Sequence, residues 1–510
     1  AEYLPELDKV CTKTADLREL FDYVQQPVYV DWGHPDKGGY KIIAEKMFEL
    51  SLPIILEKTD ENFKIEEKEY PYNLGEFTIY APGEDFSGKD FEKLDLKNAI
   101  FDNSDFSSAK LNNAYIDGAR FVRADLSNVN FEGKDLSGLN FLGANLSNTN
   151  LVNANLEGAN LTKADLSQNN LTGARFLDSN LSGANLEGAN LTNVDFTSAD
   201  LTNANLEGAN LEGANLEGAN LEGANLNYVQ FTNVDISKGS LSKALFKGTD
   251  LSQAIIINAD FTNSDLSNTN LSGQDLSSHD LKNTKLNQAN LSNTILPNQS
   301  FSGKDFEYTI FNGVDLSNKD LSHANFQYAS FDNTDLTGAN LEEAKLIQID
   351  FTKIKNKSLK DANITGASIT YSNLEGVELP INIDTVNFHS SEMNNVNFEN
   401  RNIEGGYFYN VKLNGANFEN VNMNAVKSTL QFENRPDLLS VDPTKILDEL
   451  GLGGVYVVAS PFTAHGNYVH LELLKFNNFS GADLRNANFK NSLLFYASFE
   501  NADLRNANFS

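Results

Sequence analysis

The sequence predicts an all-β solenoid, and three features of the chain support this fold class. Every fifth residue from Phe86 to Phe351 is Leu, Phe or Ile, without exception over 54 successive positions. The residue two before each of these is usually small, and the residue immediately before it is mostly Asn or Asp. A period of five fits neither the 3.6 residues of a helical turn nor the 2.0 of a flat strand. A short unit repeated this strictly is typical of a solenoid, in which each unit buries its apolar residue only against stacked neighbours.

The repeated unit reads Ala-Asn/Asp-Leu-x-x and is clearest between Ala204 and Leu226. On this unit the chain resembles the pentapeptide-repeat family over most of its length. The resemblance implies a right-handed quadrilateral β-helix, with one pentapeptide on each side and a coil of about 20 residues. With this coil length, aromatic residues 20 apart are expected to form columns inside the tube. Two such sets are Phe101, Phe121 and Phe141, and Phe311, Phe331 and Phe351.

The small inward position is occupied by a large polar residue in several repeats. A buried, unpaired ammonium group is costly, so we expect each lysine amine there to reach solvent at a corner or to meet a carbonyl. A local deformation of the coil is favoured at these positions over a ligand site, and neither a metal site nor a cofactor is predicted. The residues are Lys89, Lys134, Gln274, His279, Gln299, Lys304 and Lys319.

The register of the repeat changes after Phe351. The central residues continue at 364–379 in a second register and at 388–423 in a third. The repeat then stops, and the interruption contains a predicted helix at 443–450, closed by Gly451, and predicted strands at 455–458 and 468–473. We therefore expect an α/β insertion at residues 429–473, between a β-helix at 81–428 and C-terminal coils at 474–510.

Residues 1–80 are expected to form a small α/β segment. A capped helix at 14–24 and a strand at 28–30 precede the string Asp31-Trp32-Gly33-His34, and a second helix begins near Tyr40. Together with Gly39 and Ala44, this string resembles the last catalytic block of SGNH (GDSL-type) hydrolases, in which Asp-x-x-His follows a strand. The resemblance implies that His34 is the general base and that Asp31 orients its imidazole.

The sequence contains no Gly-Asp-Ser nucleophile block and no candidates for the Gly and Asn blocks of that family. In the family these blocks precede Asp-x-x-His, where this chain has only thirty residues. A base without its nucleophile cannot carry out acyl transfer. Three explanations are open: the hydrolase part is absent from this chain, the segment is a remnant that caps the solenoid, or the match is accidental. We favour a cap, because the open end of a β-helix exposes strand edges that invite aggregation.

Composition excludes several classes of function. The formal net charge of −31 and pI near 4.5 argue against binding to nucleic acid or to an anionic membrane. A single cysteine, Cys11, excludes an intramolecular disulfide framework and a cysteine-based zinc cluster. No apolar run approaches the roughly 18 residues of a membrane span, so membrane insertion is not expected. The sequence leaves localisation open, and we favour an extracellular or cell-envelope location.

Three functions are compatible with the sequence. The leading hypothesis is a non-enzymatic structural or protein-interaction rod, a scaffold that self-associates or displays its insertion to a protein partner. The alternative is the stalk of an SGNH-type ester hydrolase whose catalytic part is missing from this chain. The third is an acidic DNA mimic, as in the pentapeptide proteins that protect gyrase. Against it, the glutamates at positions 207, 212, 217 and 222 are five apart and fall on four different faces, whereas a mimic concentrates its charge on one face.

Overall fold

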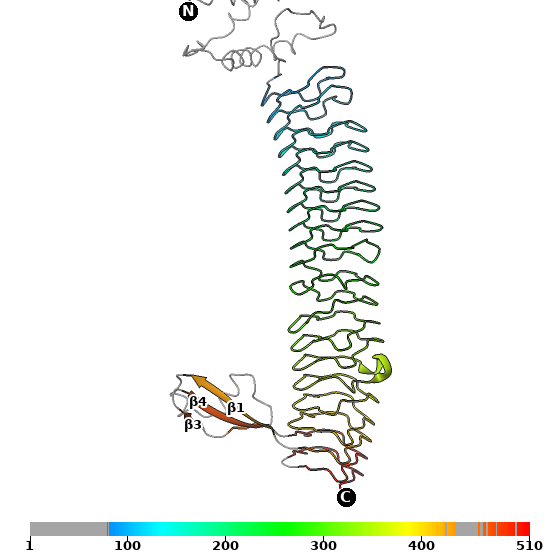
Figure 1. The fold of residues 1–510 in the computed structure, drawn as a ribbon, viewed down its shortest axis with the longest axis vertical. Helices are drawn as coiled ribbons and strands as arrows, with labels where there is room; N and C mark the ends of the chain where they lie inside the picture. Colours follow the sequence, from blue (N-terminus) through cyan, green and yellow to red (C-terminus); the bar gives the residue numbers. More distant parts are fainter. Residues whose placement is uncertain are drawn as a thin grey trace, which may run out of the picture. The chain divides into compact units, whose positions relative to one another are not determined.

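The computed structural model describes residues 79–510 except residues 80, 424–425, 434–456, 460–462, 466–467, 476 and 495–496. The chain divides into two compact units, Ala1–Ala184 and Asn185–Ser510, and the described part of each is built from the same stacked coil (Figure 1). Apart from residue 79, the segment predicted to form an N-terminal cap lies outside the described residues.

Each coil is about twenty residues long, because parallel β-bridges join residues twenty positions apart. Examples are Asp105 with Asp125 in the first unit and Asn205 with Asn225 in the second. Each bridge is isolated, so a side of the coil carries a single bridged residue and no long strand forms. A turn precedes most of the bridges, one on each side of the coil, which gives four sides per coil. The predicted β-helix solenoid with four pentapeptides per coil is confirmed.

The corner of each side is a β-turn that begins at the central residue. The amide of Ala219, for example, donates to the carbonyl of Leu216 at 3.0 Å. The third residue of the turn lies in the left-handed region, with φ of 68° at Gly218 and 56° at Asn203. Glycine has no Cβ to clash there and asparagine tolerates the conformation better than most residues. This requirement explains why Gly and Asn recur two positions after the central residue.

The core of each unit is formed by the central residues and by the small residues two positions before them. In the first unit Phe121 and Phe141 stack with ring centroids 5.7 Å apart. In the second unit Phe311 and Phe331 stack at 5.4 Å, and Phe351 is fully buried. The first column expected from the sequence is therefore stacked throughout, and the second is stacked between Phe311 and Phe331. Both are a direct result of the twenty-residue coil.

The Asn/Asp position has two structural roles. Its side-chain oxygen accepts the amide two residues later, as Asn215 does from Glu217 at 3.0 Å, which stabilises the turn. Its amide group also donates to the same position one coil away. Asn225 donates to Asn205 at 3.0 Å, and Asn205 donates to Asn185 at 3.2 Å. An asparagine at this position thus joins neighbouring coils as well as shaping its own corner.

The two register changes that the sequence predicts correspond to two coils of unusual length. Two short 3₁₀ helices, η1 (Phe351–Lys353) and η2 (Lys355–Lys357), lengthen one coil, so that Asn363 lies 23 positions from its partner Asn340. A later coil is shortened, and its bridged residues, such as Ser368 and Asn387, are 19 apart. One coil therefore gains three residues and a later coil loses one, while the stack continues.

The interruption near the C-terminus contains a small antiparallel sheet. Its strands are β1 (Val426–Glu433), β2 (Val457–Ala459), β3 (Thr463–His465) and β4 (Tyr468–Lys475). Strand β4 pairs with all three others; its register with β1 runs from Val426↔Lys475 to Glu433↔Tyr468. These strands begin before residue 429 and end after residue 473. The helix predicted at 443–450 lies outside the described residues.

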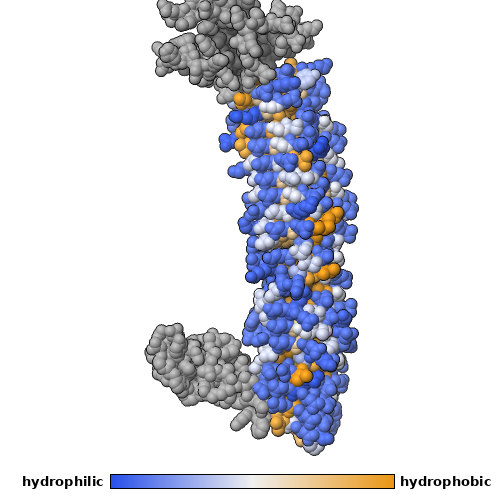
Figure 2. All heavy atoms as spheres, viewed as in Figure 1, coloured by the Kyte–Doolittle hydropathy of each residue, from blue (hydrophilic) through white to orange (hydrophobic). Residues whose placement is uncertain are grey.

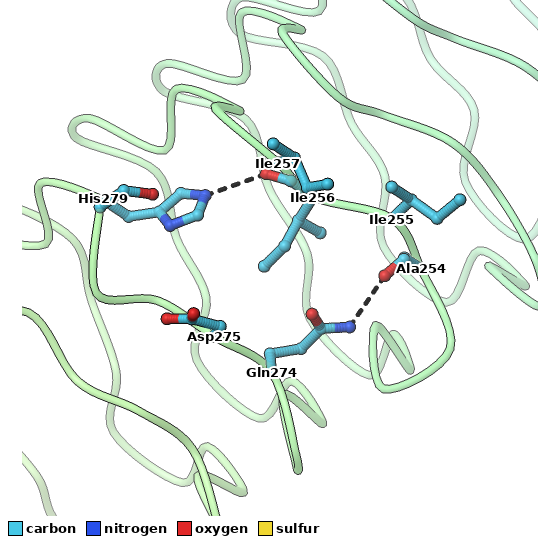
Figure 3. Close-up of a pocket in the computed structure, with 8 residues that line it drawn as sticks. Ala254, Ile255, Ile256, Ile257, Gln274, Asp275 and His279 are labelled. Atoms are coloured by element: carbon cyan, nitrogen blue, oxygen red, sulfur yellow. Dashed lines mark hydrogen bonds between the residues drawn. The ribbon is translucent and has the colours of Figure 1, made fainter.

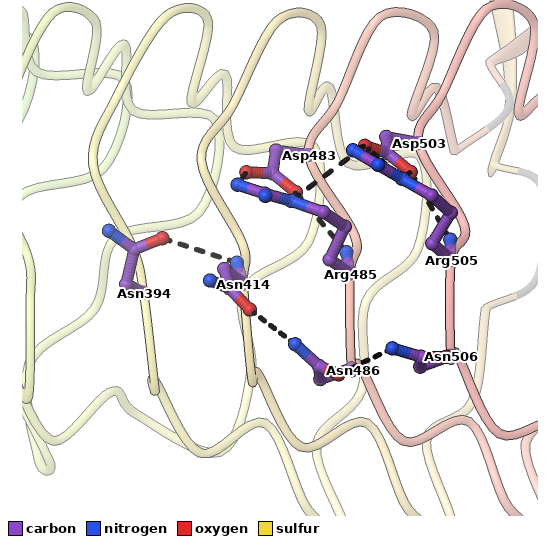
Figure 4. Close-up of polar contacts among 8 residues, drawn as sticks. All are labelled: Asn394, Asn414, Asp483, Arg485, Asn486, Asp503, Arg505 and Asn506. Atoms are coloured by element: carbon purple, nitrogen blue, oxygen red, sulfur yellow. Dashed lines mark hydrogen bonds and ion pairs between the residues drawn. The ribbon is translucent and has the colours of Figure 1, made fainter.

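The coils before and after this interruption stack directly on each other. Tyr407 bridges to Asn478, and the rings of Phe408 and Phe479 stack with centroids 4.7 Å apart. A row of hydrogen bonds between asparagines also joins the coils before the interruption to the coils after it (Figure 4). In this row Asn414 accepts from Asn486 at 3.0 Å, and Asn486 accepts from Asn506 at 3.3 Å. The interruption breaks the sequence of the repeat without breaking the stack.

Candidate functional site

The predicted catalytic pair, Asp31 and His34, lies outside the described residues. Their arrangement and their roles therefore stay a prediction. In the described part of the chain, no group of three or more His, Cys, Asp or Glu residues could hold a metal ion. No helix in that part is long and apolar enough to cross a membrane.

The lysines at the small inward position behave as the sequence predicts. Lys89 is exposed. Lys134 donates to the carbonyl of Ala114 at 2.7 Å, Lys304 to that of Leu281 at 2.6 Å, and Lys319 to that of Pro297 at 2.9 Å. Burial lowers the pKa of Lys304 to about 8 and also lowers the pKa of Lys134. These amines are held by backbone carbonyls and serve the structure of the coil.

Gln274 and His279 occupy the same inward position on two successive sides of one coil, and they line a cavity (Figure 3). The Gln274 side chain donates to the carbonyls of Leu251 at 2.6 Å and Ala254 at 2.9 Å. Nε2 of His279 lies 3.0 Å from the carbonyl oxygen of Ile256. Because a carbonyl can only accept, Nε2 carries the proton of this bond. Nδ1 of the buried ring has no hydrogen-bond partner among the described residues.

The two side chains interrupt the ladder of backbone hydrogen bonds that joins their coil to the preceding one. On the neighbouring side, Leu251 donates to the carbonyl of Asn270 at 2.8 Å in the usual way. Among the described residues, the equivalent bond from Ile256 to Asp275 is not formed, nor is the bond from Asp275 to Ala254. The ladder is re-formed one coil later, where Leu276 donates to Ile295 at 2.8 Å. The local deformation expected at these positions is confirmed.

The cavity produced by this opening has a volume of about 360 Å³. One wall is apolar, formed by Ala254 and the run Ile255–Ile257, and the other is polar, formed by Gln274, Asp275, Ser278 and His279. Gln274 and His279 stand out in the sequence as departures from the repeat, but their proximity to Ile255 does not. One signal in the sequence could have shown it. Ile255 stands where the repeat has Asn or Asp, and about one coil later Gln274 and His279 stand where the repeat has a small residue.

The visible face of the coils is mainly hydrophilic and has a few small apolar patches (Figure 2). Several surface acids are paired with a basic residue on the next coil. Lys238 lies 2.5 Å from Glu217, Lys243 lies 2.5 Å from Glu222, and Lys285 lies 2.9 Å from Asp265. Two of the four glutamates considered for DNA mimicry are therefore already paired.

Comparison with known proteins identifies the repeat. A family model described as pentapeptide repeats matches residues 85–123, 119–158, 159–197, 199–239, 240–273, 280–318, 320–352, 386–427 and 478–510. These ranges include more than half of the chain. A comparison with curated proteins found no match.

Several solved structures are similar to this chain. HetL from the cyanobacterium Nostoc sp. strain PCC 7120, a pentapeptide repeat protein involved in heterocyst differentiation regulation, is 26% identical over 52% of this chain and 87% of its own, with a TM-score of 0.16. Full-length QnrB1, a plasmid-mediated fluoroquinolone resistance protein, is 17% identical over 45% of this chain and 92% of its own, with a TM-score of 0.16. A pentapeptide repeat protein of the Arabidopsis thaliana thylakoid lumen is 24% identical over 22% of this chain and 69% of its own, with a TM-score of 0.12. These TM-scores are too low to support an argument about function.

Proposed function

Because the chain belongs to the pentapeptide-repeat family, we propose that it is a non-enzymatic scaffold that binds a protein partner or a second copy of itself. In each unit the central side chains form a buried core, so the surfaces and the interruption are the parts left for recognition. The observation that carries the proposal is the direct stacking of coils across the interruption. We call the interrupting segment, residues 426–476, the excursion. A segment that leaves a rigid scaffold in this way is a common place for recognition.

The length of the excursion follows from the bridge between Tyr407 and Asn478. These residues are 71 positions apart, whereas ordinary bridged residues are 20 apart, so the excursion adds 71 − 20 = 51 residues. Residues 426–476 are 51 in number. Their removal joins Ala425 to Asn477 and places Met423 five positions before Phe479, which restores the period of the repeat.

We expect deletion of residues 426–476 to leave the coils folded and to weaken self-association or partner binding. The two coils already stack, and the joined chain keeps the twenty-residue spacing that their bridges need. Circular dichroism melts measure folding, and sedimentation velocity measures self-association. A matched control is deletion of residues 207–226, which removes one complete coil in register and keeps the excursion.

Two results would contradict this expectation. Unfolding of the C-terminal coils on deletion of residues 426–476 would show that the coils need the excursion in order to fold. Unchanged association of a folded deletion protein would place the contact surface elsewhere on the coils.

The hydrolase hypothesis for Asp31 and His34 has a separate test. We expect the purified 510-residue chain not to hydrolyse p-nitrophenyl acetate above the buffer rate, and His34→Ala to leave that rate unchanged. The reason is that the sequence has no nucleophile block for His34 to activate. The measurement is release of p-nitrophenolate, followed by absorbance. Turnover that His34→Ala abolishes would contradict the scaffold proposal and would identify an ester hydrolase.

A further inference from the structure

One side of the second unit carries an unusual column of surface residues. Asp235, Ile255, Asp275, Ile295 and Asp315 are each 20 positions apart, so they occupy the same side of successive coils. Parallel bridges join Asp235 to Ile255 and Asp275 to Ile295. We call these five residues the acid–isoleucine column.

The two isoleucines of the column stand where the repeat normally has Asn or Asp. An aliphatic side chain can neither accept the amide two residues later nor donate to the next coil, so Ile255 forgoes both contacts that Asn215 and Asn225 make. Ile295 forgoes only the contact to the neighbouring coil, because the residue two later is Pro297, which has no amide hydrogen to donate. Instead, Ile255 is 47% exposed and Ile295 is 58% exposed, and the adjacent Ile257 is 64% exposed. Exposed apolar residues that gather within a polar surface mark contact sites more often than isolated ones do.

The opened ladder lies inside this column. The 360 Å³ cavity separates Ile255 from Asp275 and has the isoleucine run on one wall and Gln274 and His279 on the other. Its polar wall contains the buried Nδ1 of His279, which has no partner among the described residues. The cavity is therefore a place where an apolar side chain from outside can be buried beside Ile255 and Ile257.

Asp275 is the acid of the column that lines the cavity. The oxygen of Asp275 accepts the amide of Ser277 at 2.9 Å, and hydrogen bonds from Ser277 hold the pKa of this carboxyl below its ordinary value. Within the described part of the chain, no lysine, arginine or histidine forms an ion pair with Asp235, Asp275 or Asp315. Lys238, His279 and Lys355, respectively, act on these three acids electrostatically from farther away. This contrasts with Asp265, whose carboxylate pairs with Lys285.

We propose that the acid–isoleucine column binds an amphipathic basic α-helix of a protein partner, laid along the stacking direction of the coils. Neighbouring coils are about 4.8 Å apart. Residues on one face of a helix recur every three or four positions, which corresponds to about 5 Å along its axis. A helix with basic and apolar residues alternating at this interval places its cations on the aspartates and its apolar side chains on the isoleucines, one of them in the cavity. This inference rests on the proposed scaffold function and names the partner for one of its surfaces.

The test is selection of a displayed library of helical peptides, randomised on one face, against the full 510-residue chain. A second, separate selection of the same library is made against the double variant Ile255→Asn, Ile295→Asn. Ile255→Asn restores the Asn of the repeat together with its turn bond, and Ile295→Asn restores the residue type without that bond, because Pro297 has no amide hydrogen. We therefore expect this variant to melt at about the same temperature as the native chain. We expect the selected peptides to alternate Lys or Arg with Leu, Ile or Met every three or four residues. Fluorescence anisotropy should show at least tenfold weaker binding to the double variant.

Two further variants locate the contact. Asp275→Asn should weaken binding of the selected peptides and reduce its dependence on salt, because one ion pair is lost. Ile381→Asn is the matched control, since Ile381 is 64% exposed but lies outside the column; binding should not change. The protein lacking residues 426–476 should bind the peptides as the native chain does, which separates this surface from the excursion. Equal enrichment on the native chain and the double variant, or selected peptides without the basic–apolar alternation, would overturn the proposal.

Discussion

We expect Leu216→Asp to destabilise the coils around it by about 3–5 kcal/mol. Leu216 is completely buried, and its amide donates to the carbonyl of Asp235 at 2.6 Å. An aspartate there places a carboxylate in a narrow apolar tube where the central positions offer it no cation. Because a solenoid is stabilised by contacts between adjacent coils, the damage should spread outward from this position.

Hydrogen exchange of backbone amides is the measurement, since it resolves opening coil by coil where a single melting temperature does not. The control is Thr232→Asp, which adds the same charge at an exposed position on the next coil. We expect the control to change stability by less than about 0.5 kcal/mol. Equal protection in Leu216→Asp and Thr232→Asp would contradict the β-helix.

We expect Phe418→Ala to cost about 3–5 kcal/mol and to release the coils that follow the excursion. Phe418 is buried, and its ring stacks on Phe398 at 4.4 Å and on Phe489 at 4.7 Å. It also meets Phe408 and Phe479 edge to face. The alanine leaves a cavity at the position where coils from opposite sides of the excursion are joined, so both sets lose packing.

Phe418→Leu is the matched control, because leucine is the commonest central residue of this repeat. It keeps most of the apolar volume, and we expect a loss of roughly 1–2 kcal/mol. Hydrogen exchange of residues 477–494 and 497–510 reports the result directly. If alanine and leucine gave the same protection in those residues, the aromatic column would not hold the two sets of coils together.

Part of the candidate site was visible in the sequence and part was not. The inward Gln274 and His279 could be recognised because the small position of the repeat is so regular that a large residue stands out. Their effect on the ladder could not be predicted, since either side chain could have turned outward, as Lys89 does. Asp31 and His34 were recognised from a motif alone, and their arrangement is still a prediction.

The sequence by itself determined the solenoid, the length of its coil, the buried positions and the places where the register changes. It could do so because each repeat buries its central residue against copies of itself, so one five-residue pattern contains the packing rule for the whole stack. Only the tertiary structure decided which departures from the pattern meet. Ile255 and His279 are far apart along the chain and line one cavity, and Tyr407 and Asn478 are neighbours although an excursion separates them. Such contacts depend on how many residues each coil contains and on which backbone bonds a large side chain displaces, and these are properties of the stacked coils.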